Sequence, residues 1–296
     1  MSNGAQISMR GILPAVCLVI WLMATALLAA QELQLPATVA AGSGLTIPTS
    51  GSGSATFYLI GPSYVAKRQV LLGQEIHVQP LEVRSAGRYL AIVRGAGIRQ
   101  SGSFYVVAVK PATLSFLAHP SRIPVAQRDR VIGVAFIFDK WQNLVRRPET
   151  VDFRLAANDA PPVTQSVRSH DGVAWILMNS GHKAGNAKFV AALDGIEETR
   201  VIQQVAADPC HLQIRAERNA KGVLVETAPV RDCSGNPVSD GTIVTFTANG
   251  PRGLSTVDVP IKKDVAQAEL KIPGPATISV ASGVVMGNEV RVGGQQ

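Results

Sequence analysis

Apolar and polar residues alternate over short stretches in the last third of the chain. Residues 244–248 read Val-Thr-Phe-Thr-Ala, which places the apolar side chains on one side and the threonines on the other. The same period of two recurs over 212–216 and 266–272. A period of two is typical of a β-strand with one buried face. About seven such segments between 207 and 296 predict an antiparallel β-sandwich.

A turn pattern containing Asp and Asn occurs twice, 93 residues apart. The pattern Asp-x-x-x-Asn-x-Val spans 139–145 and again 232–238, and a Val-x-Phe segment follows each copy. Asp and Asn bond to their own local backbone, Gly accepts a positive φ and Pro fixes φ, so these residues end one strand and direct the next. A repeat of this length suits a whole sandwich better than a solenoid unit. The turn residues identified in this way are Asp139, Asn143, Asp232, Gly235, Asn236 and Pro237.

The strand patterns and the repeat divide the chain into four segments. An apolar leader occupies residues 1–30, and domains are expected at 31–109, 110–206 and 207–296. Short alternating segments also fill the first of these domains, which is expected to be generically immunoglobulin-like. The predicted fold class is therefore all-β, with three tandem immunoglobulin-like antiparallel β-sandwiches.

Residues 110–293 resemble the bacterial immunoglobulin-like repeats of intimin and invasin adhesins. Those repeats share a D-x-x-G-N-P-V turn and an alternating V-x-F strand, and residues 232–246 carry the full version. The earlier copy departs from it, with Gln142 in place of Gly and Leu144 in place of Pro. In that family the repeats are rigid spacers that hold a binding tip away from the cell. The resemblance therefore implies an exported location and a structural or adhesive role.

The first 30 residues have the layout of an export signal. Arg10 precedes an uncharged apolar stretch at 11–30, and Ala24-Thr25-Ala26 within it is a small-x-small cleavage site. A cleaved signal peptide and an uncleaved N-terminal anchor both fit an apolar stretch of this length. In either case the rest of the chain is expected to be exported to the periplasm, to the cell surface or into the medium.

Two cysteines remain beyond this leader, Cys210 and Cys233. They flank a predicted hairpin, whose antiparallel strands bring the two positions together. A disulfide is expected between them, because isolated cysteine pairs in exported proteins are usually bridged.

Charge and motif content exclude several classes of function. The chain has a net charge of +7, but its basic and acidic residues are interspersed, so nucleic-acid binding is not expected. The five histidines are scattered, and neither a His-Glu-x-x-His nor a Gly-x-Ser-x-Gly motif is present. We expect no catalytic, metal-binding or cofactor-binding residues, and no cofactor. Contact with a membrane is expected only through the N-terminal segment, if it stays uncleaved.

Two tryptophans carry separate expectations. Trp141 stands in a turn where a polar residue is usual, which makes it the candidate interaction residue. The alternative is that it folds back against its own sheet or the neighbouring domain. Trp175 alternates with apolar neighbours and is expected in the core or in packing between domains.

Taken together, the sequence predicts an exported, non-enzymatic structural or interaction protein of the bacterial envelope or surface. It would be a rod of immunoglobulin-like domains for adhesion or assembly, with a protein partner. The alternative is a polysaccharide- or small-ligand-binding module in the periplasm or at the cell surface.

Overall fold

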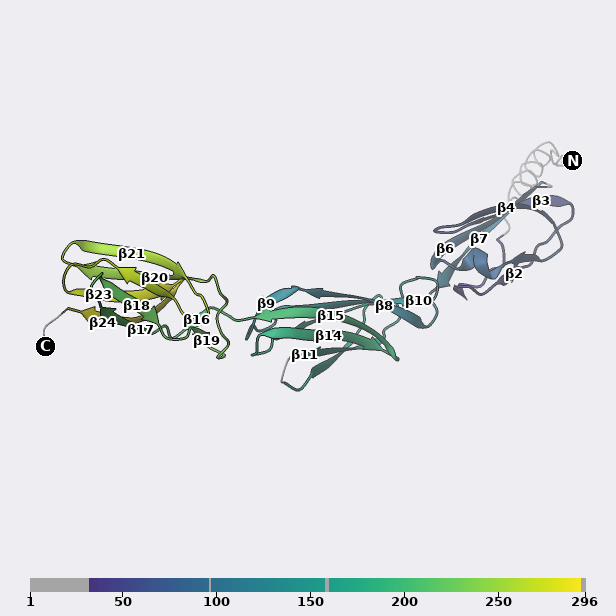
Figure 1. The fold of residues 1–296 in the computed structure, drawn as a ribbon. Coiled ribbons are helices and arrows are strands. Elements are labelled where there is room, and N and C mark those ends of the chain that lie inside the picture. The colour runs from purple at the N-terminus through teal and green to yellow at the C-terminus, as the bar shows by residue number, and fades with distance from the viewer. Residues whose placement is uncertain (1–31, 96, 158–159, 294–296) are drawn as a thin grey trace, which may run out of the picture. The chain divides into compact units, whose positions relative to one another are not determined.

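The computed structural model describes residues 32–95, 97–157 and 160–293. Apart from one short 3₁₀ turn, the regular elements of these residues are β-strands in three successive groups of sheets (Figure 1). The predicted fold class, tandem immunoglobulin-like antiparallel β-sandwiches, is confirmed. The predicted signal peptide or anchor lies outside the described residues. Within the described ranges, no helix has the length and hydropathy that crossing a membrane requires.

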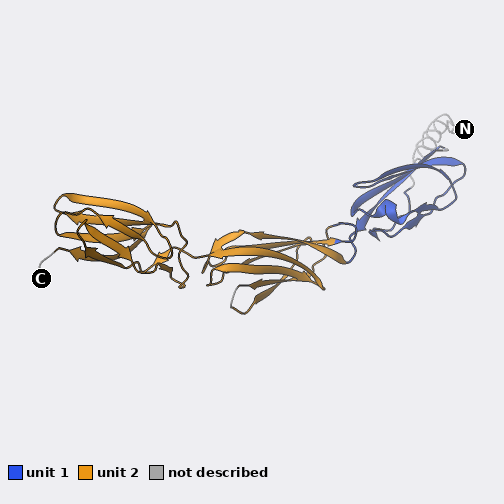
Figure 2. Ribbon diagram, in the orientation of Figure 1, with its two compact units in different colours: residues 1–110, 139–143 blue, residues 111–138, 144–296 orange. Residues whose placement is uncertain are grey.

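By the density of its internal contacts the chain divides into two compact units (Figure 2). Unit 1 holds residues 1–110 together with the turn at 139–143. Unit 2 holds residues 111–138 and 144–296, and so contains both the second and the third group of sheets.

The first sandwich pairs a five-stranded sheet, in the order β1-β7-β6-β3-β4, with the two-stranded sheet β2-β5. Its core holds the buried rings of Phe57, Tyr89 and Phe104, the last two stacked with their centroids 5.4 Å apart. Strand β1 runs parallel to β7, and the other pairs are antiparallel. The elements are β1 (Thr38–Ala40), β2 (Leu45–Ile47), β3 (Ser54–Ile60), β4 (Val65–Leu71), β5 (Ile76–Val78), the 3₁₀ turn η1 (Pro80–Val83), β6 (Gly87–Gly95) and β7 (Ile98–Val107).

The second sandwich pairs the sheet β13-β10-β8 with the sheet β12-β11-β14-β15-β9. Three buried rings, Phe116, Phe153 and Phe189, join the two sheets, with centroids 5.0 to 6.1 Å apart. The strands are β8 (Pro111–His119), β9 (Arg122–Pro124), β10 (Val131–Asp139), β11 (Thr150–Ala156), β12 (Val163–Arg168), β13 (Val173–Met178), β14 (Gly185–Leu193) and β15 (Ile196–Val205).

The third sandwich pairs the sheet β17-β18-β22 with the sheet β21-β20-β23-β24, and β16 pairs with β19 beside them. Val244, Phe246 and Ala248 on β20 are all buried, as the alternation of the sequence predicts. The strands are β16 (Pro209–Cys210), β17 (Ile214–Arg218), β18 (Val223–Thr227), β19 (Arg231–Asp232), β20 (Ile243–Gly250), β21 (Gly253–Pro260), β22 (Gln267–Leu270), β23 (Ala276–Ser282) and β24 (Val285–Val292).

A disulfide joins Cys210 at the end of β16 to Cys233, directly after β19. The two residues are 23 positions apart in the sequence and their Cα atoms lie 5.0 Å apart. The strands that they end pair with each other, Pro209 opposite Asp232 and Cys210 opposite Arg231. The bridge therefore closes the loop that contains the β17–β18 hairpin.

Replacing both cysteines with alanine should lower the free energy of unfolding of the third sandwich by about 3 kcal/mol. Closing a loop of this length removes that much chain entropy from the unfolded state. Chemical denaturation followed by circular dichroism measures the loss, and a reducing agent should change the wild type but not the double variant. Mass spectrometry that found both thiols free in the exported protein would contradict the bridge.

Candidate functional site

The second copy of the repeated turn is built around the buried carboxylate of Asp232. Its Oδ1 accepts hydrogen bonds from the backbone N–H groups of Ser234 (2.8 Å) and Asn236 (2.9 Å). Its Oδ2 accepts one from the backbone of Ala207 at 3.0 Å. Gly235 takes a φ of 82°, in the left-handed region that glycine favours. Asp232 thus closes its own turn and also fixes the segment that enters the third sandwich.

The carboxamide of Asn236 reaches a loop of the second sandwich. Its Oδ1 accepts a hydrogen bond from the backbone N–H of Ala184 at 2.8 Å. Its Nδ2 donates to the carbonyl oxygen of His182 at 2.8 Å and to Asp232 Oδ2 at 3.0 Å. Asn236 is itself buried, so both ends of the amide are used away from water. The turn of the third sandwich is therefore tied to the loop that precedes β14.

The first copy of the turn makes the same set of contacts inside unit 1. Asp139, fully buried, accepts from the N–H groups of Trp141 (2.8 Å) and Asn143 (2.9 Å). Its Oδ2 accepts from the N–H of Val109 at 3.0 Å. Asn143 accepts from the N–H of Ala86 at 2.7 Å and donates to the carbonyl oxygen of Arg84 at 2.8 Å.

The two copies also agree in the sequence spacing of their residues. The turn residues differ by 93 positions and their backbone partners by 98, since Arg84, Ala86 and Val109 correspond to His182, Ala184 and Ala207. We call each set, consisting of the Asp, the Asn and three backbone partners, a turn latch. Of the predicted turn residues, each latch brings one Asp and one Asn together, Gly235 lies within the second turn, and Pro237 forms an isolated bridge with Arg231. The sequence did not predict the backbone partners.

Hydrogen bonding keeps both buried carboxylates charged. Burial by itself raises the pKa of Asp232, but the N–H donors of Ala207, Asn236 and Ser234 outweigh it and leave the pKa below its usual value. The pKa of Asp139 is lowered in the same way, with burial opposed by donors from Asn143, Val109 and Trp141. Each latch therefore contributes stability above a pH of about 4 that is lost on acidification through the lowered pKa.

Trp141 packs against the hydrophobic core of the first sandwich and is partly buried there. A Cβ atom on Gly42 would lie 2.7 Å from the indole Cε2, so this glycine leaves room for the ring. The ammonium group of Lys140 lies 5.1 Å from the ring centroid. The indole thus has a place within the protein, and its contact with a separate partner stays a prediction.

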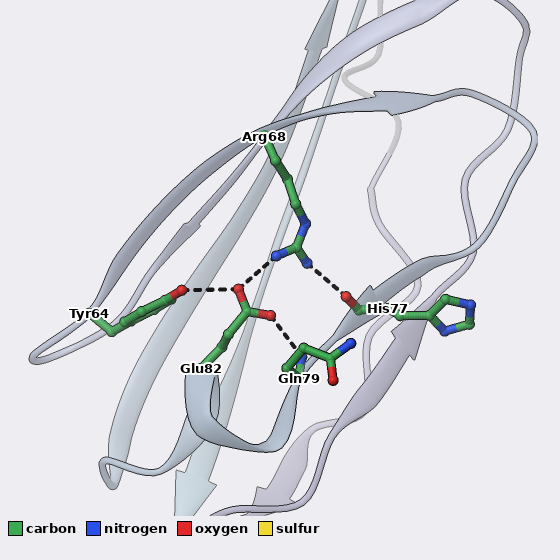
Figure 3. Close-up of polar contacts among 5 residues, drawn as sticks. All are labelled: Tyr64, Arg68, His77, Gln79 and Glu82. Atoms are coloured by element: carbon green, nitrogen blue, oxygen red, sulfur yellow. Dashed lines mark hydrogen bonds and ion pairs between the residues drawn. The ribbon is translucent and has the colours of Figure 1, made fainter.

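A third buried carboxylate, that of Glu82, ties the edge strand β4 to the turn η1 (Figure 3). Glu82 Oε1 accepts hydrogen bonds from Arg68 Nη1 at 2.6 Å and from the Tyr64 hydroxyl at 3.1 Å, and Oε2 accepts from the N–H of Gln79 at 2.7 Å. Arg68 Nη2 also donates to the carbonyl oxygen of His77 at 2.7 Å, while the His77 ring points away from the cluster. These polar groups satisfy one another, which is the pattern of a structural tie.

This tie also decides how the hollow beside it can be used. A hollow of about 440 Å³ runs along β4 and β5, lined by Arg68, Gln69, Gln74 and His77 among others. The guanidinium of Arg68 in this lining is already neutralised by Glu82. The hollow therefore offers a ligand the Glu75 carboxylate, hydroxyl, amide and imidazole groups and a few apolar side chains, but no unpaired cation. Across the described ranges, no group of three or more His, Cys, Asp or Glu residues is placed to hold a metal ion.

The outward face of the larger sheet in the first sandwich carries basic side chains. The outward positions of β3, β4, β6 and β7 hold no Asp or Glu, and their charged residues are Lys67, Arg88, Arg94 and Arg99. Arg94 and Arg99 are directly opposite each other on β6 and β7, and both are exposed. Like charges at such positions repel, by roughly 0.2–1 kcal/mol. We call these outward positions the cationic face.

The corresponding sheet of the second sandwich is different. Its outward positions mix Asp152, Arg154, Lys188 and Glu197, and Arg154 lies 3.9 Å from Glu197. The unmixed positive charge is therefore particular to the first sandwich and does not belong to the fold.

The fold is similar to that of bacterial adhesins whose structures are solved. FdeC, an Escherichia coli adhesin, superposes with a TM-score of 0.58 over 87% of this chain and 94% of its own, at 13% sequence identity. InvD of Yersinia pseudotuberculosis gives a TM-score of 0.48 over 88% and 95% of the two chains, at 12% identity. Invasin, a bacterial integrin-binding protein, gives 0.46 over 82% and 54%, at 14% identity. No protein-family model matches the sequence, and no curated protein matches it either.

Changing Asn236 to alanine should lower the stability of unit 2 by about 1–3 kcal/mol. The substitution removes both amide contacts to the loop at 182–184 and one donor to the buried Asp232 carboxylate. Hydrogen exchange should also become faster at the Ala184 amide, which would lose its acceptor.

The matched control is Asn249→Ala, at an exposed position on β20, where we expect a change below about 0.5 kcal/mol. Unchanged exchange at Ala184 in Asn236→Ala would show that the latch does not hold this loop.

Proposed function

We propose that this protein is an exported, non-enzymatic structural and interaction protein of the bacterial envelope or surface. Its three immunoglobulin-like domains would act as a stiff rod for adhesion or assembly, with a protein partner. The observation that carries this proposal is the turn latch, made twice with the same groups.

The latch supports stiffness because of where its hydrogen bonds go. In the second copy, moving the loop at 182–184 away from the turn would break both outer contacts of Asn236. Moving the segment at Ala207 would take a donor from the buried Asp232. A buried carboxylate or amide that loses its partner costs about 1–3 kcal/mol, so such movement is opposed. A plain flexible linker would leave these backbone groups to water.

Domain boundaries and export belong to the same proposal. We place the boundaries near residue 110 and between 206 and 209, where one group of sheets ends and the next begins. Residues 1–30 would serve as a signal peptide or as an anchor. The Cys210–Cys233 bridge supports an oxidising compartment, as expected outside the cytoplasm. The similarity to the adhesin FdeC supports the fold of such a spacer.

Crosslinking in intact cells, followed by affinity recovery and mass spectrometry, tests the interaction role. We expect a constant set of envelope or surface proteins to be recovered with the chain. An uncrosslinked sample processed in parallel is the control for proteins that bind after lysis. Recovery of the chain alone would contradict the proposal.

The cationic face favours a second candidate function, the binding of an acidic polysaccharide. Arg94 and Arg99 stand side by side without an outward carboxylate near them in the sheet. Guanidinium pairs hold carboxylate and sulfate groups well. An anion bridging the two would also relieve their repulsion.

The double change R94A/R99A should weaken binding to polygalacturonate about tenfold, as measured by calorimetry at low salt. Binding by the wild type should also fall as salt is added, because screening weakens contacts between exposed charges. The control R154A/K188A removes the same charge from the mixed sheet of the second sandwich and should bind like the wild type. Equal losses in the two variants would mean that only net charge matters, and the cationic face would not be a site.

A further inference from the structure

One face of the second sandwich is largely apolar although it points outward, with polar outward residues only on β8. In the sheet β13-β10-β8, alternate residues of each strand are buried in the core, and the residues between them face away from it. Trp175 is 61% exposed, Leu177 41% and Leu117 57%. Of the two places expected for Trp175, the core is therefore wrong, because the alternation turns Ala174, Ile176 and their partners inward instead. Packing between domains stays a prediction.

The outward positions of the two neighbouring strands are apolar without interruption. Across the strand pair, Val134 stands opposite Trp175 and Ile132 opposite Leu177. None of the outward positions in this sheet carries a charge. We call this set the apolar face: Leu117 on β8, Ile132, Val134, Phe136 and Phe138 on β10, and Val173, Trp175 and Leu177 on β13.

The third sandwich shows what the same sheet looks like when it faces water. Gln267 and Glu269 on β22 occupy the positions of Trp175 and Leu177, and Glu226 on β18 occupies that of Val134. Glu226 also forms an ion pair with Arg215 on the next strand, at 3.0 Å. The fold therefore does not require an apolar outer surface at this place. A contiguous exposed apolar patch of several hundred Å² is often an interaction surface.

We propose that the apolar face is a self-association surface, on which a second copy of this chain packs sheet to sheet. A two-fold arrangement places the face against itself, so every outward side chain meets a surface of the same kind. Sheets pack on sheets in this way inside each sandwich, at a spacing of about 10 Å. The absence of charge means that no like charges meet within the contact. It also gives no electrostatic feature that would select a charged partner instead.

The size of the face sets the strength of the contact. The sheet of three strands, about 4.8 Å apart and up to nine residues long, covers roughly 15 by 30 Å, which is an upper bound for the apolar face because Thr113, Ser115 and His119 also face outward on β8. This is about half of the roughly 800 Å² that each partner contributes to a standard stable interface. The dimer is therefore weak, and it matters where many copies are held close together, as on a surface.

Charge predicts how this association responds to salt. Each chain carries a net charge of +7, so two copies repel each other at a distance. Added salt screens that repulsion and leaves the apolar contact intact, so the dimer should become tighter. Association with an acidic partner would respond in the opposite direction.

Sedimentation equilibrium of the purified exported protein tests the proposal, over a concentration range reaching about 1 mM. The test variant is W175Q/L177E, which installs the residues of the third sandwich on the second. We expect the wild type to dimerise reversibly, and the variant to raise the dissociation constant at least tenfold. Both positions are exposed, so the variant should keep the unfolding temperature of the wild type to within a few degrees.

The control is Gln267→Glu, which adds the same single negative charge at the matching strand of the third sandwich without removing an apolar side chain, and should leave the dissociation constant unaltered. A wild type that stays monomeric throughout the concentration range would overturn the proposal. So would a dimer that W175Q/L177E does not weaken, or one that added salt dissociates. L117E gives a second, independent reading of the same face from strand β8 and should weaken the dimer as well.

Discussion

The burial of a charged carboxylate at the start of a turn is the constraint on which the repeated architecture depends. Asp139 is fully shielded from water and Asp232 is nearly so. An ionised carboxylate in such a place is tolerable only if N–H donors surround it. Two of its donors come from the turn itself, two and four residues further on, and a third comes from the segment leading into the sandwich. One buried charge therefore fixes both the turn and the entry of the chain.

The hydrogen bonds around the buried aspartate explain how the two copies of the turn keep one geometry with different residues. Gly235 and Gln142 stand at equivalent positions and both have positive φ values, 82° and 65°. A residue with a Cβ pays roughly 1 kcal/mol in this region, which glycine avoids. The hydrogen bonds to the carboxylate impose the conformation all the same. Gln142 in place of glycine raises the free-energy cost of the first turn and leaves its hydrogen bonds to Asp139 in place.

The parts of the structure that follow from local periodicity could be read from the sequence, and the parts that need distant partners could not. The alternation around Phe246 predicts both the strand and its buried face, and the spacing of Cys210 and Cys233 across a hairpin suggests their bridge. The receiving loop at 182–184 has no comparable signal, because it offers only backbone groups, which any residue but proline provides. The core was the wrong place for Trp175 because residues 173–178 are all apolar, so their alternation does not show which side of the strand is buried. The polar residues at matching positions of the third sandwich were the signal that could have corrected it.

The third sandwich shows why the receiving loop is nevertheless specified by sequence. In each sandwich a buried phenylalanine pairs with a residue on the next strand of its sheet, and the equivalent loop position lies seven residues before that partner. This position is Ala86 in the first sandwich, Ala184 in the second and Pro273 in the third. Proline has no N–H to donate, so the contact that an Asn carboxamide makes in the first two sandwiches cannot form there.

Along every strand, the inward and outward positions are under different constraints. Inward positions are held to apolar residues by the core, while outward positions are free to differ. One sandwich can thus present arginines, a second an apolar sheet and a third mixed charges, all on a common framework.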